Sequence, residues 1–481
     1  GVLADFGVKG EIVQVRPGPV VTLYEFEPAP GVKSSRVINL ADDIARSMAA
    51  VACRVSVVPG RNAIGIELPN QHRETVFLRA LLASKHFEAA KAELPMALGE
   101  TIGGEPFTAD LAKMPHLLIA GATGSGKSVS IHSFILSLLY KNSPETLRFI
   151  MIDPKRVELS VYGGIPHLIT PVITEGKKAV GALKFAIQEM EQRYETLLNA
   201  GKRDIISYNK GRKDDFMPYI VVIIDELADL MTTFGREVEG AVVRIAQMAR
   251  ATGIHLVVST QRPSVEVITG LIKANITSRI ALQVASNVDS RTILDTAGAE
   301  KLLGGGDMLF ISSDFSKPKR VQGAYVSEKE VKKAVAWLAK EASGFEREEI
   351  AEDELSKSAA VGVELGGDDE DLDGDDPLYE EAKKIVVESG KASASLLQRR
   401  LKVGYARAAR LLDILEEKGV VGPADGACRV MRVRETEDGE RAEDAIGWIG
   451  LLSPAFTQAF GLRDTPAVAE MDLHKLASMP F

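Results

Sequence analysis

The residues with the clearest chemistry form one glycine-rich stretch, GATGSGKS, at residues 121–128. It follows the apolar run HLLIA and precedes the amphipathic run SVSIHSFILSLLYK, so it joins a predicted strand to a predicted helix. Glycines let a backbone wrap around phosphates, so that N–H groups of the loop and of the helix N-terminus face the negative charge. Lys127 is placed for the β- and γ-phosphates of ATP and Ser128 for Mg²⁺. The predicted nucleotide-binding residues are Gly121, Ala122, Thr123, Gly124, Ser125, Gly126, Lys127 and Ser128.

Two carboxylates follow a second apolar run. Residues 220–224, IVVII, lead directly into Asp225 and Glu226, 98 residues after Lys127. Many strands end in a solvated acid, so this pattern acquires meaning only beside the glycine-rich stretch. Because the two patterns occur together, we expect Asp225 to hold Mg²⁺ with Ser128, and Glu226 to orient and deprotonate the attacking water.

A glutamine ends a third apolar run. Gln261 follows HLVVST at residues 255–260. An amide at a strand end can contact the γ-phosphate or align the water. An ordinary glutamine in a turn after a strand gives the same pattern, so the sequence leaves both interpretations open.

These residues need a sheet that brings several strand ends together. Strand-like runs occupy residues 116–120, 147–153, 219–225, 255–260, 279–284 and 307–311. Most are unbroken apolar runs, which are typical of strands buried on both faces, so we expect an α/β fold with a parallel sheet covered by helices. Residues 1–95 alternate apolar and polar positions around a Pro-Gly-Pro turn and also contain a helical pattern, which predicts a mixed α and β domain without a chemical motif.

Length and composition narrow the class of protein. The chain has 481 residues, 45% of them apolar and 26% charged, which indicates several folded domains and excludes wholesale disorder. Two cysteines and seven scattered histidines argue against a disulfide scaffold and against a cysteine or histidine metal centre. The longest uncharged run, residues 445–462, contains polar residues, a proline and three glycines, so we expect no membrane span there.

The net charge of −9 conceals an uneven distribution. Residues 346–376 hold 14 acidic and 2 basic residues, which predicts a flexible, self-repelling linker. Residues 377–434 hold 12 basic and 7 acidic residues, in a pattern of three helices followed by a β wing. This pattern predicts a winged helix-turn-helix. Residues 435–481 show neither a motif nor a clear period.

Together these motifs resemble the FtsK/SpoIIIE family of bacterial DNA translocases. The resemblance is carried by the strings MPHLLIAGATGSGKSVS, FIMIDPKRVELSVYGGIPHL, VVIIDELADLM, ARATGIHLVVSTQRPSVEVITGLIKANI and LLQRRLKVGYARAARLLDILEEKGVVGP. It implies an α domain at residues 1–95, a RecA-like P-loop ATPase motor at 96–345, the linker at 346–376 and a winged-helix γ domain at 377–434, followed by a tail of unknown structure at 435–481.

The resemblance also implies a function. ATP hydrolysis would drive a homo-hexameric ring along double-stranded DNA during chromosome segregation at cell division. The γ domain would direct loading on DNA and contact a site-specific recombinase. Members of the family carry N-terminal membrane helices, which implies that the present residues are cytoplasmic and that a segment preceding them anchors the protein in the inner membrane at the division site.

A ring motor needs an arginine from a neighbouring subunit, because the charge that develops on the γ-phosphoryl group requires an extra cation. Arg250 in ARATGIH is the first candidate and Arg279 the second; a plain surface arginine is the alternative. The resemblance further points to DNA-facing loops after Gln261 and around residues 285–291. The corresponding DNA contacts in the motor would be Arg262, Lys273 and Arg291.

Two positions depart from the family pattern. Asn287 stands where many members have lysine, which removes one backbone contact. In the γ domain, Ala406 replaces the asparagine of the familiar string GYNRAAR. Asparagine can recognise adenine through two hydrogen bonds, whereas alanine offers only apolar contact. The sequence therefore leaves open whether this γ domain recognises the DNA sequence that the family usually recognises. The predicted recognition helix keeps Arg407, Arg410 and Asp413.

Other functions remain open to the sequence. Related ring ATPases secrete proteins or move single-stranded DNA in conjugation. A γ-like DNA-reading domain would be useless to a polypeptide pump, and it also counts against a conjugative coupling protein. A DNA-binding protein without catalysis would leave residues 121–128 and the pair Asp225 and Glu226 without a purpose.

Overall fold

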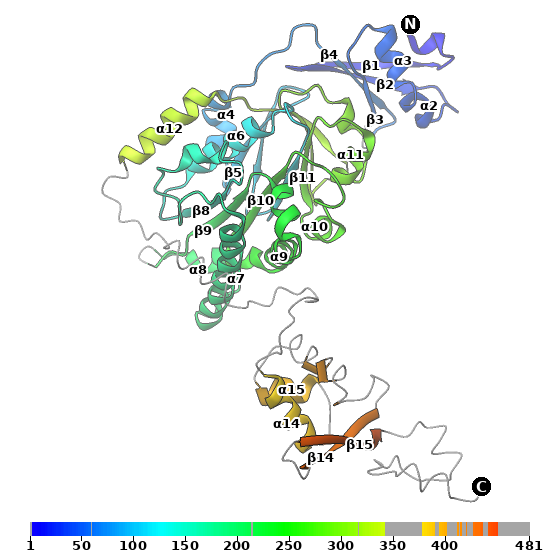
Figure 1. The fold of residues 1–481 in the computed structure, drawn as a ribbon. Coiled ribbons are helices and arrows are strands. Elements are labelled where there is room, and N and C mark those ends of the chain that lie inside the picture. Colours follow the sequence, from blue (N-terminus) through cyan, green and yellow to red (C-terminus); the bar gives the residue numbers. More distant parts are fainter. Residues whose placement is uncertain are drawn as a thin grey trace, which may run out of the picture. The chain divides into compact units, whose positions relative to one another are not determined.

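The computed structural model describes residues 2–341 except 59, 213, 214 and 316, and in the C-terminal part residues 378–389, 394–401, 411, 412, 414, 415, 420, 427–435 and 441–450. The chain divides into two compact units, residues 1–367 and 368–481 (Figure 1). Within the described ranges, no helix combines the length and the apolar character needed to cross a lipid bilayer.

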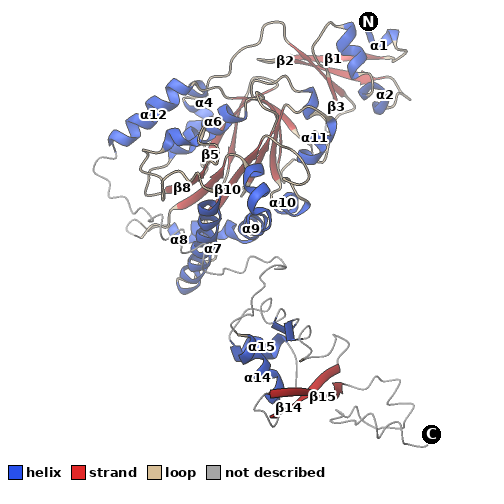
Figure 2. Ribbon diagram, viewed as in Figure 1, coloured by secondary structure: helices blue, strands red, loops and turns tan. Residues whose placement is uncertain are grey.

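The first unit begins with a small antiparallel sheet in the strand order β1-β2-β4-β3 (Figure 2). Its elements are α1 (Val2–Asp5), β1 (Gly10–Pro17), β2 (Val21–Pro28), α2 (Ser34–Ile38), α3 (Ala41–Ser47), β3 (Arg54–Val57) and β4 (Ile64–Pro69). Apolar residues of the inner strands, such as Phe26 and Ile66, share a buried core with Val37 and Ile44 of the helices. The N-terminal part is therefore mixed α and β, as the sequence predicts.

The larger sheet, whose strands are seen in red between blue helices in Figure 2, has nine strands in the order β6-β5-β13-β12-β11-β7-β10-β9-β8. The strands are β5 (Pro95–Thr101), β6 (Pro106–Asp110), β7 (Leu117–Ala120), β8 (Leu147–Ile152), β9 (Tyr219–Ile224), β10 (Ile254–Thr260), β11 (Ser278–Leu282), β12 (Asp307–Ile311) and β13 (Lys319–Gly323). The α-helices are α4 (Leu78–Leu82), α5 (Lys85–Glu88), α6 (Lys127–Lys141), α7 (Gly176–Asn199), α8 (Ile205–Asn209), α9 (Leu227–Met248), α10 (Gly270–Asn275), α11 (Asn287–Leu294) and α12 (Glu328–Glu341). Short 3₁₀ turns are η1 (Leu159–Tyr162), η2 (Ala249–Thr252) and η3 (Ala299–Lys301).

Helices cover both faces of this sheet. Side chains alternate between the faces along each strand, so that Leu118 of β7 packs in the core that contains α7 and α9, while Ile119 packs in the core that contains α6. Every residue of β7, β9 and β10 is buried. Burial on both faces explains why the sequence shows unbroken apolar runs at these strands.

The expectation of a parallel sheet is correct for only one part of it. Strands β8, β9, β10, β7 and β11 are parallel. From β12 onward the sheet continues antiparallel through β13, β5 and β6. The run at residues 307–311 is a strand as predicted, but its direction is opposite to that of β11. A buried apolar run carries no information about strand direction, so the sequence could not show this.

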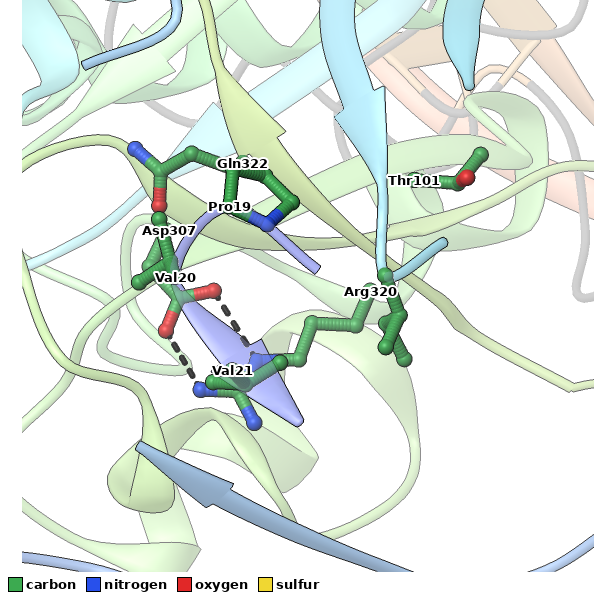
Figure 3. Close-up of a pocket in the computed structure, with 8 residues that line it drawn as sticks. Pro19, Val20, Val21, Thr101, Asp307, Arg320 and Gln322 are labelled. Carbon is green, nitrogen blue, oxygen red and sulfur yellow. Dashed lines mark hydrogen bonds and ion pairs between the residues drawn. The ribbon is translucent and has the colours of Figure 1, made fainter. Parts of the chain in front are cut away.

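A buried ion network joins the small sheet to the large one. Arg320 of β13 donates from Nη1 to Glu67 Oε2 of β4 at 2.7 Å and from Nη2 to Asp307 Oδ2 of β12 at 2.6 Å. Figure 3 shows the Arg320–Asp307 pair beside Val20 and Val21 of the N-terminal part. Arg54 donates to the other Glu67 oxygen at 2.6 Å. One ion network that spans the two sheets is therefore formed by Arg54, Glu67, Asp307 and Arg320.

The helices α4 and α5 belong by packing to the large sheet. Leu78, Leu81 and Phe87 lie in the same buried core as Ile131 of α6. They fall within residues 1–95, which the sequence assigns to the N-terminal domain. The domain limits stay a proposal, and this packing favours a boundary between β4 and α4.

The second unit is described only in part. Helices α14 (Tyr379–Ser389) and α15 (Ala394–Leu401) share a small buried core with Leu411 and Leu415. Strands β14 (Ala427–Glu435) and β15 (Arg441–Gly450) form an antiparallel hairpin. The strand β15 lies in the range 435–481, where the sequence indicated no element. The predicted linker at 346–376 lies outside the described residues.

Candidate nucleotide site

The phosphate loop, residues 121–128, connects β7 to α6 and requires glycine at defined positions. Gly124 and Gly126 have φ values of +80° and +102°, which side-chain-bearing residues rarely adopt. A Cβ atom at Gly126 would lie 2.4 Å from the nitrogen of Gly306. That nitrogen donates a hydrogen bond to the Ser125 carbonyl at 2.9 Å. The triglycine loop, residues 304–306, therefore packs against the phosphate loop and stabilises its conformation.

Lys127 lies at the start of α6 and is almost completely buried, with 3% of its side chain exposed. Its ammonium group donates to Asp225 Oδ1 at 2.8 Å, to the Asp225 carbonyl at 2.7 Å and to Ser259 Oγ at 3.1 Å. Burial raises the pKa of Asp225 above its ordinary value, and the attraction of Lys127 offsets this only in part. The predicted pair of elements thus meets in space, across 98 residues of sequence.

Glu226 is fully buried at the end of β9. Its Oε1 accepts a hydrogen bond from Thr260 Oγ1 at 2.5 Å. The backbone N–H of Gln261 points at both carboxylate oxygens, at 3.2 and 3.1 Å, and Lys155 Nζ lies 3.3 Å from Oε2. The end of β10 and the loop after β8 therefore fix the orientation of this carboxylate.

Gln261 lies beside the phosphate loop. Thr123 Oγ1 donates to Gln261 Oε1 at 2.9 Å. This contact favours the interpretation of Gln261 as part of the site over that of an ordinary turn residue. Its role towards the γ-phosphate remains a proposal.

The sequence interpretation missed three polar residues after β8. Asp153 and Glu158 are close enough to Asp225 to raise its pKa further, and Lys155 contacts Glu226. Ser128 Oγ donates to Glu158 Oε1 at 2.6 Å. The hydrogen bond of His132 to Glu158, and to a smaller extent that of Ser128, keeps the pKa of Glu158 below its ordinary value. One signal was present, because an apolar strand ends in Asp153 at the same sheet edge as Asp225, but no familiar motif singles it out.

The site fits a nucleotide with Mg²⁺. Ser125 Oγ in the phosphate loop and Asp153 Oδ1 are buried and have no hydrogen-bond partner among the described residues. A phosphate oxygen or a metal-bound water would provide the donors or acceptors that such atoms require. Lys127 supplies a cation, and Asp225 and Ser128 would supply hard oxygen ligands of the kind that Mg²⁺ prefers.

Arg250 lies at the N-terminal end of β10, whereas the phosphate loop lies at the C-terminal ends of the parallel strands. It belongs to η2, which precedes β10, whereas the phosphate loop lies beside Thr260 at the other end of that strand. Arg250 is exposed, and no ion pair involves it among the described residues. Arg279 differs, because its guanidinium group donates to Asp295 and to the carbonyls of residues 273, 276 and 293. Those bonds leave it unsuited to reach a neighbouring subunit.

The predicted DNA contacts have different surroundings. Arg262 and Arg291 are exposed, whereas Lys273 is bound to Asp295 at 2.6 Å with 20% of its side chain exposed. Asn287 is the first residue of α11 and is exposed. The residues Ala406, Arg407, Arg410 and Asp413 lie outside the described residues.

Comparison with known families decides what this site belongs to. The model of the FtsK alpha domain matches residues 1–70, that of the FtsK/SpoIIIE family matches residues 77–265, and that of the FtsK gamma domain matches residues 373–430. The chain belongs to the FtsK/SpoIIIE family. The resemblance seen in the sequence is confirmed.

Curated FtsK/SpoIIIE relatives are similar over most of the chain. The DNA translocase FtsK of Agrobacterium fabrum is 56% identical over 459 residues, which cover 89% of this chain and 51% of that protein. The DNA translocase FtsK of Caldanaerobacter subterraneus subsp. tengcongensis is 54% identical over 426 residues, covering 88% of this chain and 58% of that protein. The chain thus spans about half the length of the curated relatives it matches.

A solved structure supports the fold of this FtsK/SpoIIIE chain. The pCW3 conjugation coupling protein TcpA, in its monomer form with ATPγS, superposes with a TM-score of 0.50 and 24% identity, covering 69% of this chain and 93% of that chain. This likeness concerns the fold alone. Together with the family matches, it confirms the prediction of an α/β P-loop NTPase motor with an N-terminal α+β domain and a C-terminal winged-helix domain.

Proposed function

We propose that this chain is the motor and DNA-binding part of an ATP-driven translocase of double-stranded DNA. The observation that carries the proposal is the buried contact of Lys127 with Asp225 beside Glu226, at the C-terminal ends of the parallel strands. This constellation is what ATP hydrolysis requires, namely a cation for the phosphates, an acid for Mg²⁺ and a base for water.

Each residue has a defined part in hydrolysis. The backbone of the phosphate loop binds the phosphates, and Lys127 stays within reach of both Asp225 and the phosphoryl oxygens. Glu226 accepts the proton of the attacking water, while Gln261 aligns that water from the end of β10. When bound, Mg²⁺ neutralises developing negative charge. Ser128 and Asp225 would hold it, which requires the Ser128 hydroxyl to turn away from Glu158.

Double-stranded DNA is the proposed substrate of the motor. The curated relatives are named DNA translocases, and a γ domain matches residues 373–430. The exposed Arg262 and Arg291, together with Lys273 beside Asp295, would contact the DNA backbone. In the γ domain Arg407, Arg410 and Asp413 would face the bases.

The assembly and setting are proposed from the same family. A homo-hexameric ring would place Arg250 of one subunit at the site of the next. Chromosome segregation at cell division would be the process, with a site-specific recombinase as partner of the γ domain and an inner-membrane anchor elsewhere in the whole protein. Conjugative DNA transfer or protein secretion is the alternative function, and the γ domain argues against both.

Two measurements on the whole chain test the proposal. ATP hydrolysis is followed with and without linear duplex DNA, and displacement of a triplex-forming strand reports movement along it. We expect DNA to stimulate hydrolysis and the strand to be displaced only with ATP. The variant Lys127→Ala should fail in both assays. Hydrolysis without strand displacement, or stimulation by polypeptide in place of DNA, would contradict translocation.

A further inference from the structure

The carboxylate of Glu226 is held by contacts that the hydrolysis mechanism does not use. Glu226 is the N-cap residue of α9, yet its side chain makes no capping bond to that helix. The side chain turns instead towards the end of β10, where Thr260 and the Gln261 N–H donate to it. A base whose oxygens are occupied by protein donors has fewer lone pairs for water.

We propose that Lys155 is a positioning residue that holds Glu226 in a resting orientation, and that DNA bound at the loop after β10 releases it. This inference rests on the proposed function. It assigns to the segment after β8 a part in coupling hydrolysis to DNA.

Lys155 is suited to a contact that must break. Its ammonium group lies 3.3 Å from Glu226 Oε2 and 3.8 Å from Asp229 Oδ2. The Lys155 side chain is 39% exposed, whereas that of Glu226 is 1% exposed. A partly solvated ion pair is weak, so it can bias the orientation of a carboxylate without locking it. Asp229, in the first turn of α9, offers the ammonium group a second partner when Glu226 leaves.

The loop after β10 is directly connected to the same carboxylate. Thr260 Oγ1 donates to Glu226 at 2.5 Å and accepts from the N–H of Arg262 at 3.0 Å. The next residues are at the surface, since the Arg262 side chain is exposed and Val265 is 71% exposed. A shift of the backbone at residues 261 and 262 must therefore change the donors of Glu226. Binding of a phosphate backbone to Arg262 is a direct cause of such a shift.

The test compares ATP turnover of the whole chain with and without linear duplex DNA for the wild type and two variants. Lys155→Met keeps the length of the side chain but removes the charge, and Lys155→Arg keeps the charge. Lys332→Met is the matched control, because Lys332 makes an exposed ion pair with Glu328 on α12 and is paired with neither Glu226 nor Asp229. Thermal unfolding of each variant shows that it is folded.

We expect Lys155→Met to raise turnover without DNA by about two- to fivefold, the range set by one partly exposed ion pair. The rate with DNA and the KM for ATP should stay unchanged, so the stimulation ratio falls by the same factor. Lys155→Arg and Lys332→Met should keep the wild-type ratio. A parallel fall of both rates in Lys155→Met would show that Lys155 supports the chemistry itself and would overturn the inference, as would an unchanged ratio. Absence of DNA stimulation in the wild type would refute the proposed function, and with it this coupling.

Discussion

At the level of single residues, Gly124 and Gly126 of the phosphate loop are required for different reasons. Gly124 is required only by its backbone conformation, whereas Gly126 also lacks space for a Cβ atom. Both have positive φ, but a Cβ at Gly124 would meet nothing within 4 Å, whereas one at Gly126 would collide with Gly306. Gly124→Ala should cost about 1–2 kcal/mol, the left-handed conformation alone. Gly126→Ala should cost about 1–3 kcal/mol more, because it also disrupts the Gly306–Ser125 hydrogen bond. Thermal unfolding checks the order, and equal losses of stability would contradict it.

Glu226 allows chemistry to be separated from stability. In Glu226→Gln the amide oxygen can still accept from Thr260 and the Gln261 N–H, so folding and ATP binding should persist. Loss of the general base should lower turnover by about 10²- to 10⁴-fold. ATP binding and steady-state hydrolysis are measured on the same preparation, with Glu328→Gln on α12 as the control substitution. Turnover close to that of the wild type would assign the base to another residue.

Among the elements, the strands that carry the site were predictable and the rest of the sheet was not. Strands β7, β9 and β10 are unbroken apolar runs that lead into the phosphate loop, Asp225 and Gln261, so their C-terminal ends could be predicted from the sequence. In a parallel arrangement these C-terminal ends lie on the same side of the sheet. Strands β5 and β13 pair although about 220 residues separate them, and no local pattern records which strands pair.

The same reasoning explains what was missed at the site. Lys155 and Glu158 lie in a loop whose composition matches many solvated loops. The contact of Lys155 with Glu226 arises from the position of β8 beside β9, and that of Glu158 with Ser128 from the position of the same loop beside α6. A contact that depends on which strand is the neighbour has no fixed spacing in the sequence, so no motif can reveal it.

The buried ion network gives the junction of the two sheets a pH dependence. Burial alone would raise the pKa of Glu67, but Arg54 and Arg320 hold it below the ordinary value of 4.5. As the pH falls, the unfolded carboxyl is protonated first, so the contribution of Glu67 is complete above about pH 5 and is lost below it. Glu67→Gln should therefore lower stability by about 3–5 kcal/mol at neutral pH, the cost of breaking a buried pair, and by progressively less in acid.

Unfolding of Glu67→Gln and of the wild type is compared from neutral pH down to the acid range. Glu25→Gln is the control, since Glu25 is equally buried but is paired with the half-exposed Arg16 and Arg61. Glu25→Gln should lower stability less than Glu67→Gln does. A constant difference between the wild type and Glu67→Gln at all pH values would contradict the depressed pKa.

For the whole molecule, charge is divided between a nearly balanced motor, an acidic linker, a basic γ region and a C-terminal segment, residues 435–481, with 9 acidic and 3 basic residues. Residues 377–434 carry a net charge of +5, so the chain should bind duplex DNA with a salt-dependent affinity. Ala406→Asn would add one base contact and no phosphate contact. Discrimination against a scrambled duplex should then increase by about 1–3 kcal/mol with an unchanged salt slope. Competition binding measures both, and equal selectivity would show that position 406 does not face a base.

In the proposed ring, the active site would become complete only on assembly of the subunits. Arg250 lies on the turn before β10, at the opposite end of the parallel strands from Glu226, so in the proposed ring it would act at the site of another subunit. Arg250→Ala should keep ATP binding but lower turnover by about 10³-fold or more, as expected for an arginine that stabilises the transition state. Subunits carrying Lys127→Ala should hydrolyse no ATP themselves but would still present Arg250. Mixing the two inactive variants should therefore restore part of the activity, because some rings pair an intact phosphate loop with an intact arginine. Full turnover of Arg250→Ala alone, or no recovery in the mixture, would assign the role to another arginine.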